Sequence, residues 1–168
     1  MDADALRAQQ APLKQQYQDD PASARIVMTA RGAIHTAAPA CTVNTDLGSL
    51  VAGLHPAAGG DGSQACSGDM MLQALVACSG VTFSAVAIAM GIPINSASVT
   101  ARGEMDFRGT LGVDRHVAVG MTSVELEFQI DSSAEDAKLS KLVELTERYC
   151  VVLQTLAKPA QLVSRWKR

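Results

Sequence analysis

The side chains of this chain that are best suited to redox or nucleophilic chemistry are its four cysteines, at positions 41, 66, 78 and 150. Two of them could form a redox pair, because a thiolate that attacks a peroxide becomes a sulfenic acid, which a second thiol converts to a disulfide. Cys78 lies in an apolar segment. Cys150 follows Glu147-Arg148-Tyr149 at a predicted helix end, where a cation or a new helix N-terminus would stabilise a thiolate. Taken singly, each is more often an inert buried side chain, and spacing alone does not show that they meet.

Such a site also needs a cation to keep the sulfur ionised and to polarise the peroxide. Arg25 and Arg31 in the first predicted strands are the candidates, because an arginine stays charged and donates through a forked set of N–H groups. Either arginine is also readily interpreted as a solvated surface charge. The competing chemistry is a metal site built from Cys41, Cys66, His35 and His55, although their spacing matches no zinc motif.

Bulk composition narrows the class of protein. The chain has 168 residues, 48% of them hydrophobic, and a formal net charge of -3, which predicts a single globular domain and neither nucleic acid nor anionic lipid as a partner. The N-terminus lacks the basic start and apolar run of a secretory signal, and there is no CxxC pair. We therefore expect reduced thiols in the cytoplasm.

These residues must be positioned by helices and strands. The order of the predicted elements indicates an α+β domain over residues 24–168, preceded by an arm over residues 1–23. A helix is predicted to begin near Ser67-Gly68-Asp69 and to run to the stop signal Gly91-Ile92-Pro93. Its residues 70–90 carry no charge and are long enough to cross a bilayer, but their Ala, Ser and Thr content favours a helix buried on all sides. A second subunit would have to cover part of that helix. The remaining predicted elements are strands at 26–29, 34–36, 41–45, 97–107, 116–130 and 161–166, a loop at 54–63, a helix opened by a capping box at Ser133–Asp136, a break near Cys150, and a short apolar piece at 151–156.

Three stretches, in this order, are similar to a known family: Gly59-Gly60-Asp61-Gly62 followed by Leu72-Gln73-Ala74-Leu75-Val76-Ala77-Cys78; then Arg108-Gly109-Thr110-Leu111-Gly112-Val113-Asp114-Arg115; then Leu145-Thr146-Glu147-Arg148-Tyr149-Cys150 with Gln154-Thr155-Leu156. Over about residues 24–166 the chain resembles the OsmC/Ohr family of osmotically inducible and organic hydroperoxide resistance proteins, and most closely its OsmC-like branch. The three stretches are specific jointly rather than singly.

This resemblance implies an intertwined α+β homodimer with antiparallel sheets around a long central helix and two active sites at the subunit interface. It implies a thiol peroxidase acting in oxidative stress defence, with Cys78 as the peroxidatic cysteine, Cys150 as the resolving cysteine and Arg31 as the activating arginine. The implied substrates are organic hydroperoxides, and an external dithiol such as a lipoyl group would recycle the enzyme. No bound cofactor or metal is implied.

Two positions depart from the family pattern. A glutamate that pairs with the arginine commonly stands ten positions before the first cysteine, but here that position is Gly68 and the nearest carboxylate is Asp69, which we take as its substitute. A proline commonly follows the second cysteine, where Val151 stands. The missing glutamate favours one alternative function, a non-catalytic stress protein that binds a small molecule in the same interface pocket.

Overall fold

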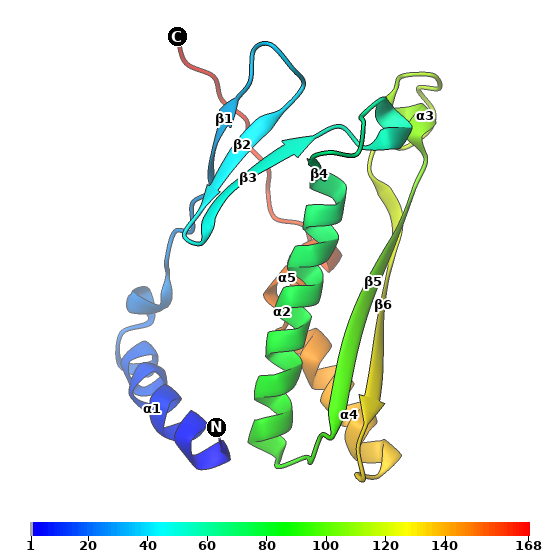
Figure 1. Cartoon of the computed structure of the whole chain (residues 1–168). Helices are drawn as coiled ribbons and strands as arrows, with labels where there is room; N and C mark the ends of the chain where they lie inside the picture. Colours follow the sequence, from blue (N-terminus) through cyan, green and yellow to red (C-terminus); the bar gives the residue numbers. More distant parts are fainter. Residues whose placement is uncertain (1) are drawn as a thin grey trace. The chain divides into compact units, whose positions relative to one another are not determined.

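The computed structural model (Figure 1) describes residues 2–168. These residues divide into two compact units. Unit 1 contains the chain up to Gln9, Ala74–Thr100 and Glu127–Arg168, and unit 2 contains Gln10–Gln73 and Ala101–Leu126. Both helices and sheets are present, so the predicted α+β class is confirmed. Helix α1 (Ala3–Asp19), in the predicted arm, buries no residue, and a short 3-10 turn, η1 (Pro21–Ala24), follows it.

Unit 2 holds a four-stranded sheet in the order β1 (Arg31–Ile34), β2 (Cys41–Thr45), β3 (Gly48–Gly53) and β4 (Ala65–Cys66). The first three strands are antiparallel, and β4 runs parallel to β3.

Two of the N-terminal strand predictions need correction, and one strand was not predicted. The strand predicted at 34–36 lies earlier, as β1 (Arg31–Ile34). Residues 26–29 form no strand, and Val27 in their middle is 94% exposed. Conversely, β3 was missed and pairs with β2 through a tight turn at Asp46 and Leu47. The physical reason is that β propensity measures the fit of a side chain to a half-buried pleated surface. The apolar run at 26–29 has no partner strand, whereas the glycine-flanked β3 has two.

The two later strands are confirmed as β5 (Ser96–Met105) and β6 (Met121–Asp131), which pair with each other. The second begins later than predicted, because a short helix, α3 (Phe107–Thr110), and a turn occupy the connection. The Asp106 side chain accepts the Arg108 N–H at 2.9 Å and also pairs with the Arg108 guanidinium. Gly109 packs so closely that a Cβ there would lie 2.3 Å from the Ala118 carbonyl oxygen.

Helix α2 (Ser67–Met90) has the predicted bounds and ends at Gly91, whose φ of +64° is the left-handed conformation of a helix C-cap. The prediction that α2 is buried on all sides counted on a second subunit, and within this single chain the helix is buried on one face only. Its buried residues recur every fourth position, on one face, and Val81 on another face is 72% exposed: Leu75, Ser79, Phe83, Ala87. The apolar composition of α2 indicates how much of its surface must be buried, and the rest of a single chain buries only part of that surface.

By length and composition alone, α2 could also cross a membrane, but core helices of soluble proteins meet the same criteria.

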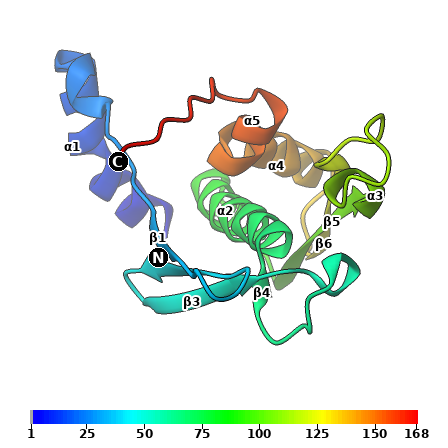
Figure 2. The ribbon, with the colours of Figure 1, turned by 90° about the horizontal axis from the view of Figure 1, so that it is seen from above.

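In unit 1, helices α4 (Asp136–Tyr149) and α5 (Val151–Ala157) lie beside α2 (Figure 2). The predicted break at Cys150 is confirmed. The predicted capping box is wrong, because the N-cap is Glu135 without a side-chain bond, and Ser132 instead accepts the Ala134 N–H at 3.0 Å. The strand predicted at 161–166 is also absent, and Trp166 there is 80% exposed.

The core of unit 1 forms where the second half of α2 meets α4 and the adjoining strand segments. Its buried members are Phe83, Ala87, Ile92 and Leu142. The Phe83 and Phe128 rings stack with centroids 5.5 Å apart. This packing fixes α2 relative to α4, and therefore the end of α4 relative to the middle of α2.

Candidate active site

The structure brings Cys78 and Cys150 together within unit 1, although they are far apart in sequence. Cys78 is on α2, and Cys150 lies between α4 and α5. Both are free thiols, and the Cys150 thiol is a hydrogen-bond partner of the Cys78 sulfur. Cys150 is completely buried whereas Cys78 is partly exposed. A reagent from solvent therefore meets Cys78 first.

The local fold of Cys150 explains why the two sulfurs meet at a helix start. Its N–H donates to the Thr146 carbonyl at 2.9 Å, which closes α4, and its own carbonyl accepts the Gln154 N–H at 2.9 Å, which opens α5. Its backbone is extended between these bonds, with φ -71° and ψ 107°. Because the first N–H groups of a helix have no intrahelical acceptor, those of α5 are available to the two sulfurs.

These contacts lower the pKa of Cys78. Burial by itself raises the pKa of this thiol, because it penalises the charged form. Hydrogen bonds to the sulfur outweigh that effect: in decreasing order they come from the Val152 N–H, the Cys150 thiol, the Val151 N–H and the Thr82 hydroxyl. The net result is a Cys78 pKa below the ordinary thiol value.

The pKa of Cys150 moves in the opposite direction. Burial raises it most, the Leu153 and Val152 N–H groups lower it, and the hydrogen bond to Cys78 and the charge on Cys78 raise it further. The pair therefore ionises in order: Cys78 becomes a thiolate first, and Cys150 remains a thiol that donates to it. Cys78 is thus the partly exposed nucleophile of the pair, and Cys150 is its buried proton donor.

Thr82 is a site residue that the sequence reasoning missed. It follows Cys78 by four positions on α2, and its hydroxyl donates to the Cys78 carbonyl oxygen at 2.7 Å. The available signal was that spacing, because residues four apart on a helix share a face.

The other two predicted site residues belong to unit 2. Arg31, at the start of β1, and Asp69, in the first turn of α2, are both exposed, and within residues 2–168 neither forms an ion pair. Their roles stay predictions. At Gly68 an added Cβ would meet the sulfur of Cys66 and the terminal methyl of Met121, each at 3.6 Å. The space beside position 68 is thus bordered by sulfur and methyl groups.

The residues weighed as a metal site take part in local structure instead. Across residues 2–168, no group of three or more His, Cys, Asp or Glu side chains is arranged to hold a metal ion. The Nε2 atom of His35 bonds to the Thr42 hydroxyl at 2.8 Å. His55 accepts the Ala57 N–H at 3.0 Å, at the start of the short 3-10 turn η2 (Pro56–Ala58) within the predicted loop, and stacks on Phe107.

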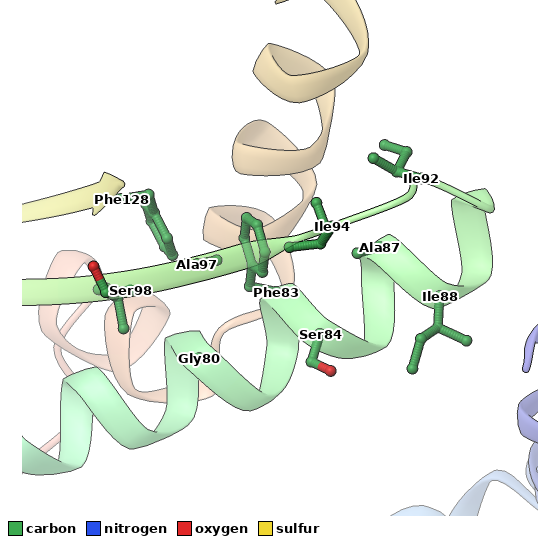
Figure 3. Close-up of a pocket in the computed structure, with 11 residues that line it drawn as sticks. Gly80, Phe83, Ser84, Ala87, Ile88, Ile92, Ile94, Ala97, Ser98 and Phe128 are labelled. Atoms are coloured by element: carbon green, nitrogen blue, oxygen red, sulfur yellow. The ribbon is translucent and has the colours of Figure 1, made fainter. Parts of the chain in front are cut away.

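Unit 1 also contains a pocket of about 390 Å³ between α2 and the strand segments (Figure 3). The stacked rings of Phe83 and Phe128 form part of its lining, together with small residues such as Gly80 and Ala87. At about 100° per helical residue, Gly80, Phe83 and Ala87 lie roughly 140–200° around α2 from Cys78. The pocket and the cysteine pair are therefore on opposite sides of the helix.

Comparison with protein families gives one match: the family model described as OsmC-like protein matches residues 60–164, more than half of the chain. The matched region includes both Cys78 and Cys150. A search of curated protein sequences gave no significant match.

Solved structures with the same fold cover most of this chain. An OsmC-like protein from Mycoplasma pneumoniae superposes with a TM-score of 0.65 at 17% identity, covering 80% of this chain and 89% of that one. An organic hydroperoxide resistance protein OsmC from Legionella pneumophila gives 0.62 at 17% identity, covering 80% and 93%. An organic hydroperoxide resistance protein from Elizabethkingia anophelis gives 0.62 at 16% identity, covering 80% and 92%. At these identities the likeness shows the fold.

Proposed function

Because the chain belongs to the OsmC-like protein family, we propose that it is a cytoplasmic thiol-dependent peroxidase that reduces organic hydroperoxides in defence against oxidative stress. The observation that carries the proposal is the asymmetry of its cysteine pair. The accessible Cys78 has a lowered pKa, and the buried Cys150 has a raised pKa. Peroxide reduction needs one thiolate to react first and one thiol held in reserve.

In the first step the Cys78 thiolate attacks one oxygen of the hydroperoxide. A sulfur–oxygen bond forms, the O–O bond breaks, and the alkoxide leaves and takes up a proton to become the alcohol. The sulfur has given up two electrons and is now a sulfenic acid. The N–H groups of Val151 and Val152 are donors available to the sulfur anion before the attack.

The first step prepares the second. The negative charge on Cys78 is one of the causes that raise the pKa of Cys150, and oxidation removes that charge. The Cys150 sulfur then ionises more readily, attacks the sulfenic sulfur and expels hydroxide, which is protonated to water. A disulfide results, and an external dithiol, such as a lipoyl group, returns both cysteines to thiols by two exchange reactions.

Two further parts of the proposal come from unit 2 and from a second chain. Arg31 would supply the cation that activates the peroxide, and Asp69 would orient it in place of a glutamate at position 68. The functional unit would be a homodimer with active sites at the interface. Two neighbours of the same fold carry the name organic hydroperoxide resistance protein, which supports the substrate class.

The test is the intact mass of the reduced protein after one equivalent of cumene hydroperoxide. We expect wild type to lose two hydrogens, Cys150→Ser to gain one oxygen at Cys78, and Cys78→Ser to remain unchanged. Cys66→Ser is the matched control, because it removes a partly buried thiol outside the pair, and it should behave as wild type. Undiminished peroxide consumption by Cys78→Ser would refute the assignment.

A second candidate is a non-catalytic protein that binds a small molecule, which the pocket beside Phe83 and Phe128 favours. That pocket is across the helix from Cys78, so it would be a separate site. Native mass spectrometry of protein purified from its own host tests this candidate. A retained small molecule lost in Ala87→Phe, together with peroxide rates no faster than those of free thiols, would replace the peroxidase proposal.

A further inference from the structure

The Thr82 hydroxyl has two acceptors within reach and one proton to donate. Its Oγ1 atom donates to the Cys78 carbonyl oxygen at 2.7 Å, and it also lies within hydrogen-bonding reach of the Cys78 sulfur. Because side chains on a helix tilt towards its N-terminus, a hydroxyl at position 82 is directed back over the turn that carries Cys78. One proton can serve only one of these acceptors at a time.

Back-bonding hydroxyls of this kind also occur elsewhere in unit 1. Ser79 donates to the Leu75 carbonyl, and Thr155 donates to the Val151 carbonyl at 2.8 Å. Neither of these hydroxyls is among the groups that shift the pKa of Cys78 or Cys150. Thr82 differs because the residue four positions earlier is the cysteine whose sulfur also accepts.

We propose that Thr82 stabilises the reactive form of Cys78 by turning its hydroxyl proton from the Cys78 carbonyl to the Cys78 sulfur when that sulfur ionises. The direction follows from charge, since a hydrogen bond to an anion is roughly twice as strong as one between neutral groups. The carbonyl keeps the ordinary helical N–H bond as its partner, so it is not left unsatisfied. The movement is a rotation of one hydroxyl and requires no change in the helix.

This inference deepens the proposed peroxidase function and rests on it for its biological meaning. The groups of unit 1 that act on the Cys78 sulfur are two backbone N–H groups of α5, the Thr82 hydroxyl and one titratable group, the Cys150 thiol. A change in the ionisation of Cys78 after substitution at position 82 can therefore be assigned to the lost donor, provided that Cys150 is unchanged.

The experiment is the pH profile of Cys78 alkylation by iodoacetamide, read as the mass of the peptide that contains Cys78. Thr82→Val keeps the shape of the side chain and removes the proton, so the midpoint should move to higher pH. At a pH below both midpoints the thiolate fraction should fall about two- to tenfold, the effect of one hydrogen bond. The midpoint is the quantity to compare, because a more basic thiolate is also a better nucleophile.

Two variants separate chemistry from structure. Thr82→Ser keeps the hydroxyl and should retain the wild-type midpoint. Ser79→Ala removes the same kind of intrahelical bond from α2 without removing a donor to the Cys78 sulfur, and it should leave the Cys78 midpoint unchanged. A Thr82→Val profile that coincides with wild type, or a Thr82→Ser midpoint shifted as far as that of Thr82→Val, would overturn the inference.

Alkylation needs no peroxide, so this test can fail independently of the proposed function. If wild type consumes hydroperoxide but Thr82→Val leaves the midpoint in place, only the role of Thr82 is wrong. If the midpoint shifts but no variant consumes hydroperoxide, Thr82 acts on the sulfur as argued and the peroxidase proposal fails.

Discussion

At the scale of single residues, the backbone after Cys150 matters as much as any side chain. The family pattern has a proline where this chain has Val151, and the Val151 N–H is one of the donors to the Cys78 sulfur. A proline has no N–H group to donate. This departure from the family pattern therefore adds a donor at the reacting atom.

Val151→Pro tests this donor. Proline suits the first position of a helix, and Cys150 already has the extended backbone that a residue before proline adopts, so the fold should be retained. Because a lowered pKa depends on groups that favour the thiolate, losing one of them raises the pKa of Cys78. We expect the midpoint of Cys78 alkylation to move to higher pH, with an unchanged thermal unfolding midpoint. Val151→Ala keeps the N–H and is the control; an equal shift in Val151→Ala would contradict the argument.

The residue scale also shows what sequence could not supply. Neither the apolar surroundings of Cys78 nor the helix end at Cys150 indicated that the two sulfurs meet; that expectation came from resemblance to a family. Two of the four donors to Cys78 are backbone N–H groups, and every residue except proline has an N–H, so no side-chain pattern singles those two out. The only sign of Thr82 in the sequence is its spacing of four residues from Cys78 in a predicted helix.

At the scale of elements, the connection between β5 and β6 is built around close backbone approach. Gly109→Ala would place a Cβ 2.3 Å from the Ala118 carbonyl oxygen, so the loop must shift. We expect a loss of about 1–3 kcal/mol in the free energy of unfolding, measured by urea denaturation. Gly120→Ala is the matched control, because an added Cβ at that position meets no atom within 4 Å. Equal stability of the two variants would show that the approach at Gly109 is not constraining.

Elements with clear start and stop signals in the sequence were predicted well. Strands whose formation depends on pairing with another strand were not. Helix α2 runs from Ser67 to Met90 between a glycine-rich loop and the left-handed Gly91, and its bounds were predicted correctly. The run at 26–29 has the composition of a strand but pairs with no other segment among residues 2–168. The missed β3 is defined by its two neighbours rather than by its own residues.

At the scale of the whole molecule, exposed apolar side chains remain where a single chain has no more surface to cover them. Val81 on α2 is 72% exposed, and Leu162 and Trp166 in the C-terminal segment are 91% and 80% exposed. Covering such side chains with a partner chain would be favourable, because it removes apolar surface from water. Their exposure is the observation that supports the homodimer in the proposed function.

A charge on the exposed side of α2 tests the homodimer. We expect sedimentation equilibrium to give the dimer mass for wild type and the monomer mass for Val81→Glu at micromolar concentration, because burying an unpaired carboxylate costs several kcal/mol. Ala137→Glu adds the same charge at an exposed position in the first turn of α4, where a carboxylate is favourable, and should remain dimeric. A monomeric wild type would remove the homodimer from the proposal.

The Val152 amide contacts both sulfurs of the pair. When Cys78 is ionised, the hydrogen of this amide faces an anionic acceptor, whereas a disulfide would offer only a neutral and much weaker one. If the pair forms a disulfide as proposed, the start of α5 would be held less tightly, although no backbone bond would break. The exchange of this single amide with deuterated solvent would then report the redox state, and a reductase approaching Cys150 would meet a helix end that is easier to open.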